Sequence, residues 1–252
     1  MGASVAAVIC AAGSSRRMGG VKKEYLPLKP GLGEQKPLTV LYAAVSEFSV
    51  CSEIGPIVVT LPPNYADKEN AVLSGLMEEL RLIDPQRIMF VEGGPTRRVS
   101  VHNALSHLEQ YNPSYVLIHD GARPWIKKSL IENVISAVIK YGAVIPALPL
   151  TETPKELYSS LETNDLPASA AGNFIKRHLR RAELCLAQTP QGFKFGEILF
   201  AHEKAAEKEK QGHAEYTDDA ELWGEFIGEV AVIPGDPENR KITYPEDLGR
   251  IN

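Results

Sequence analysis

Small residues and positive charges are concentrated in one short stretch near the start of the sequence. The apolar run 5–10 leads directly into Ala11-Ala12-Gly13-Ser14-Ser15, and the next eight positions hold four cations: Arg16, Arg17, Lys22 and Lys23. Small residues let backbone N–H groups approach phosphate oxygens closely, and cationic side chains neutralise the phosphate charge. Because the chain as a whole carries a net charge of −5, this local excess of positive charge predicts a polyphosphate-binding loop.

Two common nucleotide-binding patterns are absent from this stretch. Gly13 follows a predicted strand, but neither G-x-G-x-x-G nor G-x-x-x-x-G-K-[ST] is present. The sequence therefore supports neither a nicotinamide dinucleotide fingerprint nor a P-loop. Taken alone, a solvated basic turn explains the stretch equally well.

A second predicted strand end carries two glycines ahead of a predicted helix. Gly93 and Gly94 permit close approach of the backbone to a planar base or a sugar. Their N–H groups, together with the Ser100 hydroxyl, could read the edge of the base. A glycine turn at the start of a helix is the ordinary alternative, and it explains this segment when the segment is considered alone.

Asp120 stands at the end of a third predicted strand and is followed by Arg123. Carboxylate oxygens suit a hard cation such as Mg²⁺, and Arg123 can orient or neutralise the carboxylate in an ion pair. His119 lacks a partner at metal-binding spacing and is expected to be packed or hydrogen-bonded. Segments 188–193 and 235–243 add a hydroxyl and an ammonium group at two further strand ends. All five segments lie at one edge of the predicted sheet, which favours a shared site.

The elements that must position these residues alternate along the chain. Short runs rich in valine and isoleucine predict strands at 5–10, 56–61, 87–91, 115–118, 143–148, 185–188 and 228–233. Helical periodicity predicts helices at 37–48, 66–80, 97–110, 128–141 and 195–211, with a short helix starting near Thr217-Asp218-Asp219. This alternation predicts an α/β fold with a mostly parallel, twisted sheet covered by helices on both faces. Ligands of such sheets bind beyond the carboxyl ends of the strands.

Residues 150–183 interrupt the alternation with a polar stretch that has too little apolar content to form its own core. Loops of this length without structure are uncommon inside compact domains. We expect a projecting arm, in the form of a β-hairpin that grips a second subunit.

Composition limits the classes of protein to which the chain can belong. The 252 residues are 44% apolar and 23% charged, and they suffice for one large α/β domain. No apolar run reaches the roughly 20 residues of a membrane-spanning helix, and no secretory signal pattern is present. The acidic net charge argues against nucleic-acid binding. Three widely spaced cysteines, Cys10, Cys51 and Cys185, predict reduced, buried thiols in a cytoplasmic protein.

Together, the motifs resemble those of the 2-C-methyl-D-erythritol 4-phosphate cytidylyltransferase family of the methylerythritol phosphate pathway of isoprene biosynthesis. The matching elements are A-A-G-x-x-x-R-M, K-x-Y-L, G-G-x-x-R-x-x-S-V, H-D-x-A-R-P, T-P-Q-x-F, T-D-D and N-x-K-[IV]-T-x-P-x-D-L, in that order. The resemblance implies a Rossmann-like nucleotidyltransferase domain over 1–252 that uses CTP and Mg²⁺ and releases pyrophosphate. It also implies a homodimer in which the 150–183 arm of one subunit completes the site of the other.

The resemblance further implies roles for individual residues. The catalytic set is Arg17, Lys23, Asp120 and Lys241, with Asp120 also the metal ligand. The nucleotide-binding set is Ala11, Ala12, Gly13, Ser14, Ser15, Gly93, Gly94, Ser100, Asp120 and Gly121. The set that binds the sugar-alcohol phosphate is Arg123, Thr153, Arg181, Thr189 and Lys241, with Arg181 donated by the neighbouring subunit. One departure from the family pattern is Glu24, where glutamine is common.

Three alternatives remain open on the sequence alone. A ribitol 5-phosphate cytidylyltransferase has closely related motifs, although A-A-G and Arg16-Arg17-Met18 favour methylerythritol phosphate. A nicotinamide-dependent oxidoreductase on a Rossmann sheet lacks its glycine fingerprint here. A non-catalytic nucleotide-binding module has no reason to bring Lys23, Asp120 and Lys241 to one edge of a sheet.

Overall fold

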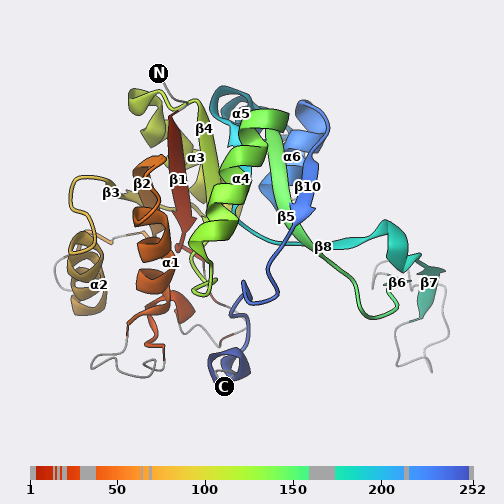
Figure 1. The fold of residues 1–252 in the computed structure, drawn as a ribbon, viewed down its shortest axis with the longest axis horizontal. Helices are drawn as coiled ribbons and strands as arrows, with labels where there is room; N and C mark the ends of the chain where they lie inside the picture. Colours follow the sequence, from red (N-terminus) through yellow and green to blue (C-terminus); the bar gives the residue numbers. More distant parts are fainter. Residues whose placement is uncertain are drawn as a thin grey trace.

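An eight-stranded β-sheet organises the chain in the computed structural model, which describes residues 4–13, 15, 18, 22–28, 38–63, 65–67, 70–158, 174–212 and 216–249 (Figure 1). The order across the sheet is β10-β5-β9-β4-β1-β2-β3, and β8 pairs with β5 off this path. The strands are β1 (Val5–Cys10), β2 (Ile54–Leu61), β3 (Ile88–Glu92), β4 (Tyr115–Asp120), β5 (Ala143–Pro149), β8 (Cys185–Ala187), β9 (Gln191–Lys194) and β10 (Ala231–Pro234). Among the described strands of this sheet, β8 and β9 are the ones that run antiparallel to their neighbours, which confirms a mostly parallel sheet.

Helices cover both faces of the sheet, because the strands are apolar on both sides. Val5, Ala7 and Ile9 of β1 face a core with α1, α2 and α4, whereas Ala6 and Val8 face a core with α3, α5 and α6. The helices are α1 (Val40–Ser49), α2 (Ala71–Arg81), α3 (Arg97–Leu108), α4 (Lys128–Tyr141), α5 (Phe195–Lys210) and α6 (Asp219–Phe226). None of those in the described ranges is long and apolar enough to cross a bilayer.

Side-chain caps set where several helices begin. Thr39 accepts a hydrogen bond from Tyr42 N at 3.1 Å, so α1 begins at Val40 rather than at residue 37. Asn70 caps α2 in the same way through Leu73 N, and this helix begins five residues later than expected. A capping oxygen satisfies a backbone donor that the first turn would leave unpaired. Periodicity located these helices, and the caps fixed their first residues.

Strand β9 is an addition to the predicted elements. The sequence analysis placed 188–193 at the end of a strand and predicted no further strand there, but Gln191–Lys194 form an antiparallel strand between β4 and β5 in the middle of the sheet. A Cβ atom at Gly192 would lie 3.0 Å from Val134 Cγ1 and 3.1 Å from Val138 Cβ, both on α4. The glycine that resembled a turn residue therefore lets α4 pack closely over this strand.

The segment expected to be an arm departs from the main sheet (Figure 1). Strands β6 (Lys155–Leu157) and β7 (Ile175–His178) pair antiparallel in a separate two-stranded sheet. Residues 159–173 between them lie outside the described residues. Cys185, at the start of β8, is exposed, so the prediction of a buried thiol was wrong there, whereas Cys51 is buried. The exposed cysteine belongs to the segment that leaves the core.

Candidate active site

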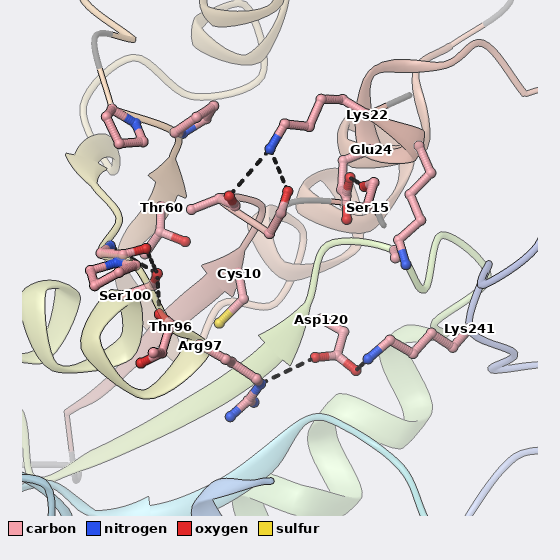
Figure 2. A pocket seen from close by; sticks show the side chains of 18 residues that line it. Cys10, Ser15, Lys22, Glu24, Thr60, Thr96, Arg97, Ser100, Asp120 and Lys241 are labelled. Atoms are coloured by element: carbon pink, nitrogen blue, oxygen red, sulfur yellow. Dashed lines mark hydrogen bonds and ion pairs between the residues drawn. The ribbon is translucent and has the colours of Figure 1, made fainter. Parts of the chain in front are cut away.

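A cavity of about 510 Å³ opens at the carboxyl ends of β1, β2, β3 and β4 (Figure 2). This volume lies within the range of roughly 300–1,000 Å³ typical of small-molecule sites. β1 pairs with β2 on one side and with β4 on the other, so the chain changes direction across the sheet beside it. Such switch points are where open α/β sheets bind ligands. The lining residues are Cys10, Ala12, Gly13, Ser15, Lys22, Lys23, Glu24, Thr60, Pro62, Pro63, Gly94, Pro95, Thr96, Arg97, Ser100, Asp120, Ala122 and Lys241.

The first loop forms one wall of the cavity with Ala12, Gly13 and Ser15. Lys22 Nζ donates to the carbonyl oxygens of Ala12 (3.3 Å) and Gly13, as Figure 2 shows. An ammonium group on the loop carbonyls fixes their direction and adds positive charge to the wall. Lys22 was noted in the sequence only as one of four cations, and the structure gives it this specific contact.

Ala11, another residue predicted in this loop, does not line the cavity. Ala11 is buried behind it, because its N–H donates to Thr60 O at 3.1 Å and its carbonyl accepts from the Tyr25 hydroxyl at 3.4 Å. Ser14 and the predicted catalytic Arg17 lie outside the described residues. Their roles stay predictions.

Lys23 and Glu24 enter the cavity wall from a short 3-10 helix, Lys23–Tyr25, and both are buried. Glu24 Oε2 accepts a hydrogen bond from Ser15 Oγ at 3.4 Å. Burial raises the pKa of Glu24, and the charges of Lys23 and Lys22 only partly oppose this. The ionised form of this carboxyl group is therefore destabilised by its burial in the wall, although Lys22 and Lys23 lie nearby.

Replacing Glu24 with glutamine should raise the melting temperature by roughly 2–4 °C near neutral pH. The folded pKa lies above its usual 4.5, so the ionised carboxylate destabilises the folded state at higher pH. This penalty disappears as the pH falls below 4.5, where the carboxyl is protonated in both states. Melting curves across this range test the idea, with the surface variant Glu132→Gln as control. A pH-independent difference would contradict it.

Gly93 lets the second loop pack against the first, and Gly94 lets it pack against α3. A Cβ atom at Gly93 would lie 2.2 Å from Ala12 Cβ, and one at Gly94 would lie 2.1 Å from Val99 Cγ1. The close approach that the glycines permit is therefore between parts of the protein. Ser100 Oγ accepts from Gly94 N at 3.0 Å and donates to Thr96 O at 2.9 Å. This hydroxyl fixes the conformation of the loop at the cavity rim.

Asp120 lies on the floor of the cavity, surrounded by three cations. Its Oδ2 atom is 2.9 Å from Lys241 Nζ and 3.4 Å from Arg123 Nε, and its Oδ1 atom is 3.7 Å from Arg97 Nε. Burial alone would raise the pKa of Asp120, but the charges of Lys241, Arg97 and Arg123 hold it far below its usual value. The carboxylate is therefore ionised at any working pH, and the cluster retains an excess of positive charge.

Neighbouring backbone and side chains position this cluster. Ile242 N donates to Ala122 O at 2.9 Å, which brings Lys241 to the end of β4. Asp120 N donates to Thr189 Oγ1 at 3.1 Å, and the same hydroxyl lies 3.0 Å from His119 Nδ1. Burial lowers the pKa of His119 to about 4, so the imidazole is neutral and packed, as expected. Thr189 thus contacts Asp120 without lining the cavity.

The oxygen atoms of Asp120 are the candidate ligands for the expected Mg²⁺. Lys241 Nζ lies 2.9 Å from Asp120 Oδ2, whereas Arg97 Nε lies 3.7 Å from Oδ1, beyond hydrogen-bonding distance. Within the described ranges no group of three or more histidine, cysteine, aspartate or glutamate side chains could enclose a metal ion. Because Mg²⁺ commonly uses one or two carboxylates together with substrate phosphates and water, the residues fit a metal shared between Asp120 and a bound phosphate.

Four of the remaining predicted residues lie away from the cavity. Gly121 packs behind it, where a Cβ atom would lie 3.0 Å from Cys10 O. Arg123 donates to Asn239 O at 2.8 Å and reaches the site only through Asp120. Thr153 and Arg181 are exposed on the arm, where Arg181 Nη1 donates to Thr151 O at 2.6 Å. Within one chain, the described residues of the arm, 150–158 and 174–183, do not line this cavity.

Sequence reasoning missed Arg97, Thr60 and Cys10 as lining residues. Arg97 was visible as a cation at a helix start after two glycines, but its neighbour Arg98 has the same sequence context. Burial raises the pKa of the Cys10 thiol to about 12, so it is a packed, neutral wall residue. Only the packing of α3 against the sheet distinguishes Arg97 from Arg98.

The family model for 2-C-methyl-D-erythritol 4-phosphate cytidylyltransferase matches residues 5–252. The chain belongs to this family. It is 38% identical over 247 residues, 97% of its length, to a bifunctional enzyme IspD/IspF of Bradyrhizobium sp. (strain BTAi1 / ATCC BAA-1182). It is 33% identical over 248 residues, 98% of its length, to a protein of the same name from Bartonella tribocorum. Each match covers 55% of the relative, so the chain spans about half the length of these curated proteins.

Solved structures of the 2-C-methyl-D-erythritol 4-phosphate cytidylyltransferase family share the fold. The 4-diphosphocytidyl-2C-methyl-D-erythritol synthase of Anaerococcus prevotii aligns with a TM-score of 0.74 at 25% identity, covering 98% of this chain and 93% of that one. The cytidylyltransferase of Thermus thermophilus aligns with a TM-score of 0.66 at 27% identity, covering 96% and 94%. The Rossmann-like α/β class and the family resemblance are thereby confirmed.

Proposed function

We propose that this chain transfers CMP from CTP to 2-C-methyl-D-erythritol 4-phosphate, giving 4-diphosphocytidyl-2-C-methyl-D-erythritol and pyrophosphate. The observation that carries the proposal is the cavity at the strand ends, where Lys23 lines the wall and Lys241 and Arg97 flank a buried Asp120. A cationic cavity of this size suits a nucleoside triphosphate and a second phosphate better than a neutral cofactor. Membership of the family supplies the identity of both substrates.

In the proposed reaction an oxygen of the sugar-alcohol phosphate attacks the α-phosphorus of CTP. A new P–O bond forms, the bond to the bridging oxygen of the β-phosphate breaks, and pyrophosphate leaves. A phosphomonoester has a second pKa near ~6, so the nucleophile is already largely dianionic and needs no general base. The remaining barrier is repulsion between anions and charge on the phosphoryl oxygens, which fixed cations reduce. We assign that role to Lys23, Arg17 and Lys241.

Asp120 would hold the divalent metal together with the phosphates of CTP. A bound Mg²⁺ would neutralise phosphate charge and draw electron density from the phosphoryl oxygens. The chain itself keeps the carboxylate ionised and oriented. Lys241 pairs with Asp120 Oδ2, and the backbone N–H of Asp120 donates a hydrogen bond to Thr189 Oγ1. Mg²⁺ and a cytoplasmic location belong to this proposal.

Selection of cytosine would rest on the Ser100 hydroxyl. A hydroxyl has one donor and two acceptor positions. Thr96 O takes the donor and Gly94 N takes one acceptor position, so only an acceptor remains for a base. The exocyclic amino group of cytosine donates to such an acceptor, whereas the carbonyl oxygen of uracil cannot. A polar site of this kind rejects a mismatched edge strongly, because its groups would be left unpaired.

Pyrophosphate release from purified protein tests the activity. CTP with methylerythritol phosphate should give rapid release, CTP with ribitol 5-phosphate slow release, and UTP with either sugar phosphate little release. Faster turnover of ribitol 5-phosphate would establish the closest alternative function instead. No release with any combination would exclude a nucleotidyltransferase and leave a nucleotide-binding module. Equal rates with UTP and CTP would contradict the role given to Ser100.

The arm would join two copies into a homodimer and present Thr153 and Arg181 to the neighbouring cavity. Apolar side chains on and beside the arm are exposed although the main core is closed: Leu157, Phe174, Ile175, Leu184 and Leu186. Exposed apolar groups gathered on a projecting segment mark a contact surface. Because Thr153 and Arg181 do not line the cavity of their own chain, a second copy is the partner that gives Arg181 a phosphate to bind.

Replacing Leu186 with aspartate should convert a dimer into a monomer and lower turnover together. Leu186 is 54% exposed on β8, and a charge there would have to be desolvated in the interface. Light scattering should give twice the chain mass of 27.6 kDa for the unaltered protein and a single chain mass for the variant. Val232→Asp, at a similarly exposed position on β10, away from both β8 and the arm, is the matched control. A monomeric unaltered protein with full activity would refute the arm's role.

A further inference from the structure

Two adjacent arginines at the start of α3 make ion pairs of similar length with two consecutive helices, α5 and α6. Arg97 Nη1 lies 2.8 Å from Asp219 Oδ2 on α6, and Arg98 Nη2 lies 2.7 Å from Glu209 Oε2 on α5. Only Arg97 lines the cavity, whereas Arg98 is buried between α3 and α5. Both are therefore arginine–carboxylate ion pairs, but only the Arg97–Asp219 pair involves a residue that lines the cavity.

Arg97 lies between two carboxylates and is closer to Asp219 than to Asp120. Its Nη1 is 2.8 Å from Asp219, whereas its Nε is 3.7 Å from Asp120 Oδ1, the contact drawn as a dashed line in Figure 2. The attraction of Asp219 thus holds Arg97 short of hydrogen-bonding distance to the cavity carboxylate. Arg97 therefore does not form a hydrogen bond with Asp120 Oδ1.

Asp219 is itself firmly held in its charged form. It is the first residue of α6, its side chain is 0% exposed, and His202 Nε2 lies 3.0 Å from its Oδ1 atom. Burial alone would raise the pKa of Asp219, but the Arg97 charge and the His202 hydrogen bond lower it below its usual value. The N-terminal end of a helix also favours a negative charge. The mechanism proposed above gives no role to this buried charge.

We infer that Asp219 is a positioning residue of the active site, which acts through Arg97 to keep Asp120 Oδ1 available to a metal–nucleotide complex. Without the charge of Asp219, Arg97 would close on Oδ1, and both oxygens of Asp120 would then be occupied by protein cations. The inference deepens the proposed function and rests on it. It assigns a role to the second aspartate of the T-D-D element.

Asp219→Asn tests the inference, because it removes the charge and keeps the shape. Electron paramagnetic resonance of Mn²⁺ in the enzyme–CTP complex, without sugar phosphate, gives the metal affinity directly. Loss of such a supporting group typically costs about 10–100-fold in metal affinity or activity, and we expect both Mn²⁺ affinity and kcat to fall in that range. Glu209→Gln is the matched control: it should lower the melting temperature similarly and leave Mn²⁺ affinity and kcat unchanged.

A double-mutant cycle with Arg97→Ala separates positioning from stability. If Asp219 acts through Arg97, adding Asp219→Asn to Arg97→Ala should change neither Mn²⁺ affinity nor kcat further. If Asp219→Asn does not fold, Arg97→Lys serves as a second variant. It keeps the positive charge but removes the guanidinium group that reaches both Asp219 and Asp120, so it should also lower Mn²⁺ affinity and kcat. The inference would be overturned if the effects of Asp219→Asn and Arg97→Ala on Mn²⁺ affinity and kcat were additive. It would also be overturned if Asp219→Asn, like Glu209→Gln, lowered only the melting temperature. An unaltered protein without turnover would instead overturn the proposed function.

Discussion

Lys23→Ala is expected to lower kcat by about 10²–10³ at saturating CTP, the typical cost of removing one preorganised contact to developing charge. Lys23 is buried in the wall of the cavity next to the first loop, so its ammonium group is largely removed from solvent screening. Charge stabilisation is stronger in such surroundings than in water. Because the contact strengthens as the transition state forms, kcat should fall more than the KM for CTP rises.

Steady-state pyrophosphate release at saturating CTP measures this effect. Lys128→Ala, which removes an exposed lysine paired with Glu132, controls for a general change in charge. Circular dichroism should show that both variants keep the fold. A Lys23→Ala variant with near-normal kcat would remove Lys23 from the transition state and transfer the role to the other cations of the site.

Asp120→Asn is expected to lower kcat by about 10³-fold or more, because it removes two contributions at once. The carboxylate is the predicted metal ligand, and it is also the common counter-charge of Lys241, Arg123 and Arg97. Asparagine has the same shape but leaves three partly buried cations without that charge, so Lys241 would lose its fixed position. Higher Mg²⁺ concentrations should restore little of the rate.

The stability of the same variant gives an independent check. The folded pKa of Asp120 is depressed, so the carboxylate stabilises the protein above its usual pKa of 3.8 and loses this contribution only as the pH falls below 3.8. The melting temperature of Asp120→Asn should therefore lie below that of the unaltered protein near neutral pH, and the gap should narrow only under strongly acidic conditions. An Asp120→Asn variant with both normal turnover and normal stability would exclude the carboxylate from the site.

Elements with a clear hydrophobic period could be predicted to the residue. Strand β1 and helix α4 have the expected bounds, Val5–Cys10 and Lys128–Tyr141, because one is apolar throughout and the other repeats with helical period. Strand β9 could not be predicted in this way. Its Gly192 resembles a turn residue, and its place between β4 and β5 depends on strands distant in the sequence.

Some residues of the candidate site could also be predicted from local sequence, whereas others could not. Ala12, Gly13, Lys23, Gly94 and Ser100 were predicted from motifs at strand ends, and they line one cavity with Asp120 and Lys241. Motifs reveal residue types at a loop, and parallel strands bring such loops to one edge. They do not reveal which way a long side chain points. For that reason the contact of Lys22 with the first loop was missed.

The sequence by itself determined the class of fold, the family and the edge of the sheet where the site lies. Each of these depends on local periodicity and on short motifs in a fixed order. Only the tertiary structure decided that Arg97 faces the cavity while Arg98 faces α5, and that Asp219 reaches Arg97 from α6. The physical reason is that charge pairs form through space between helices far apart in the chain, and no local pattern records which carboxylate lies within 3 Å of which cation.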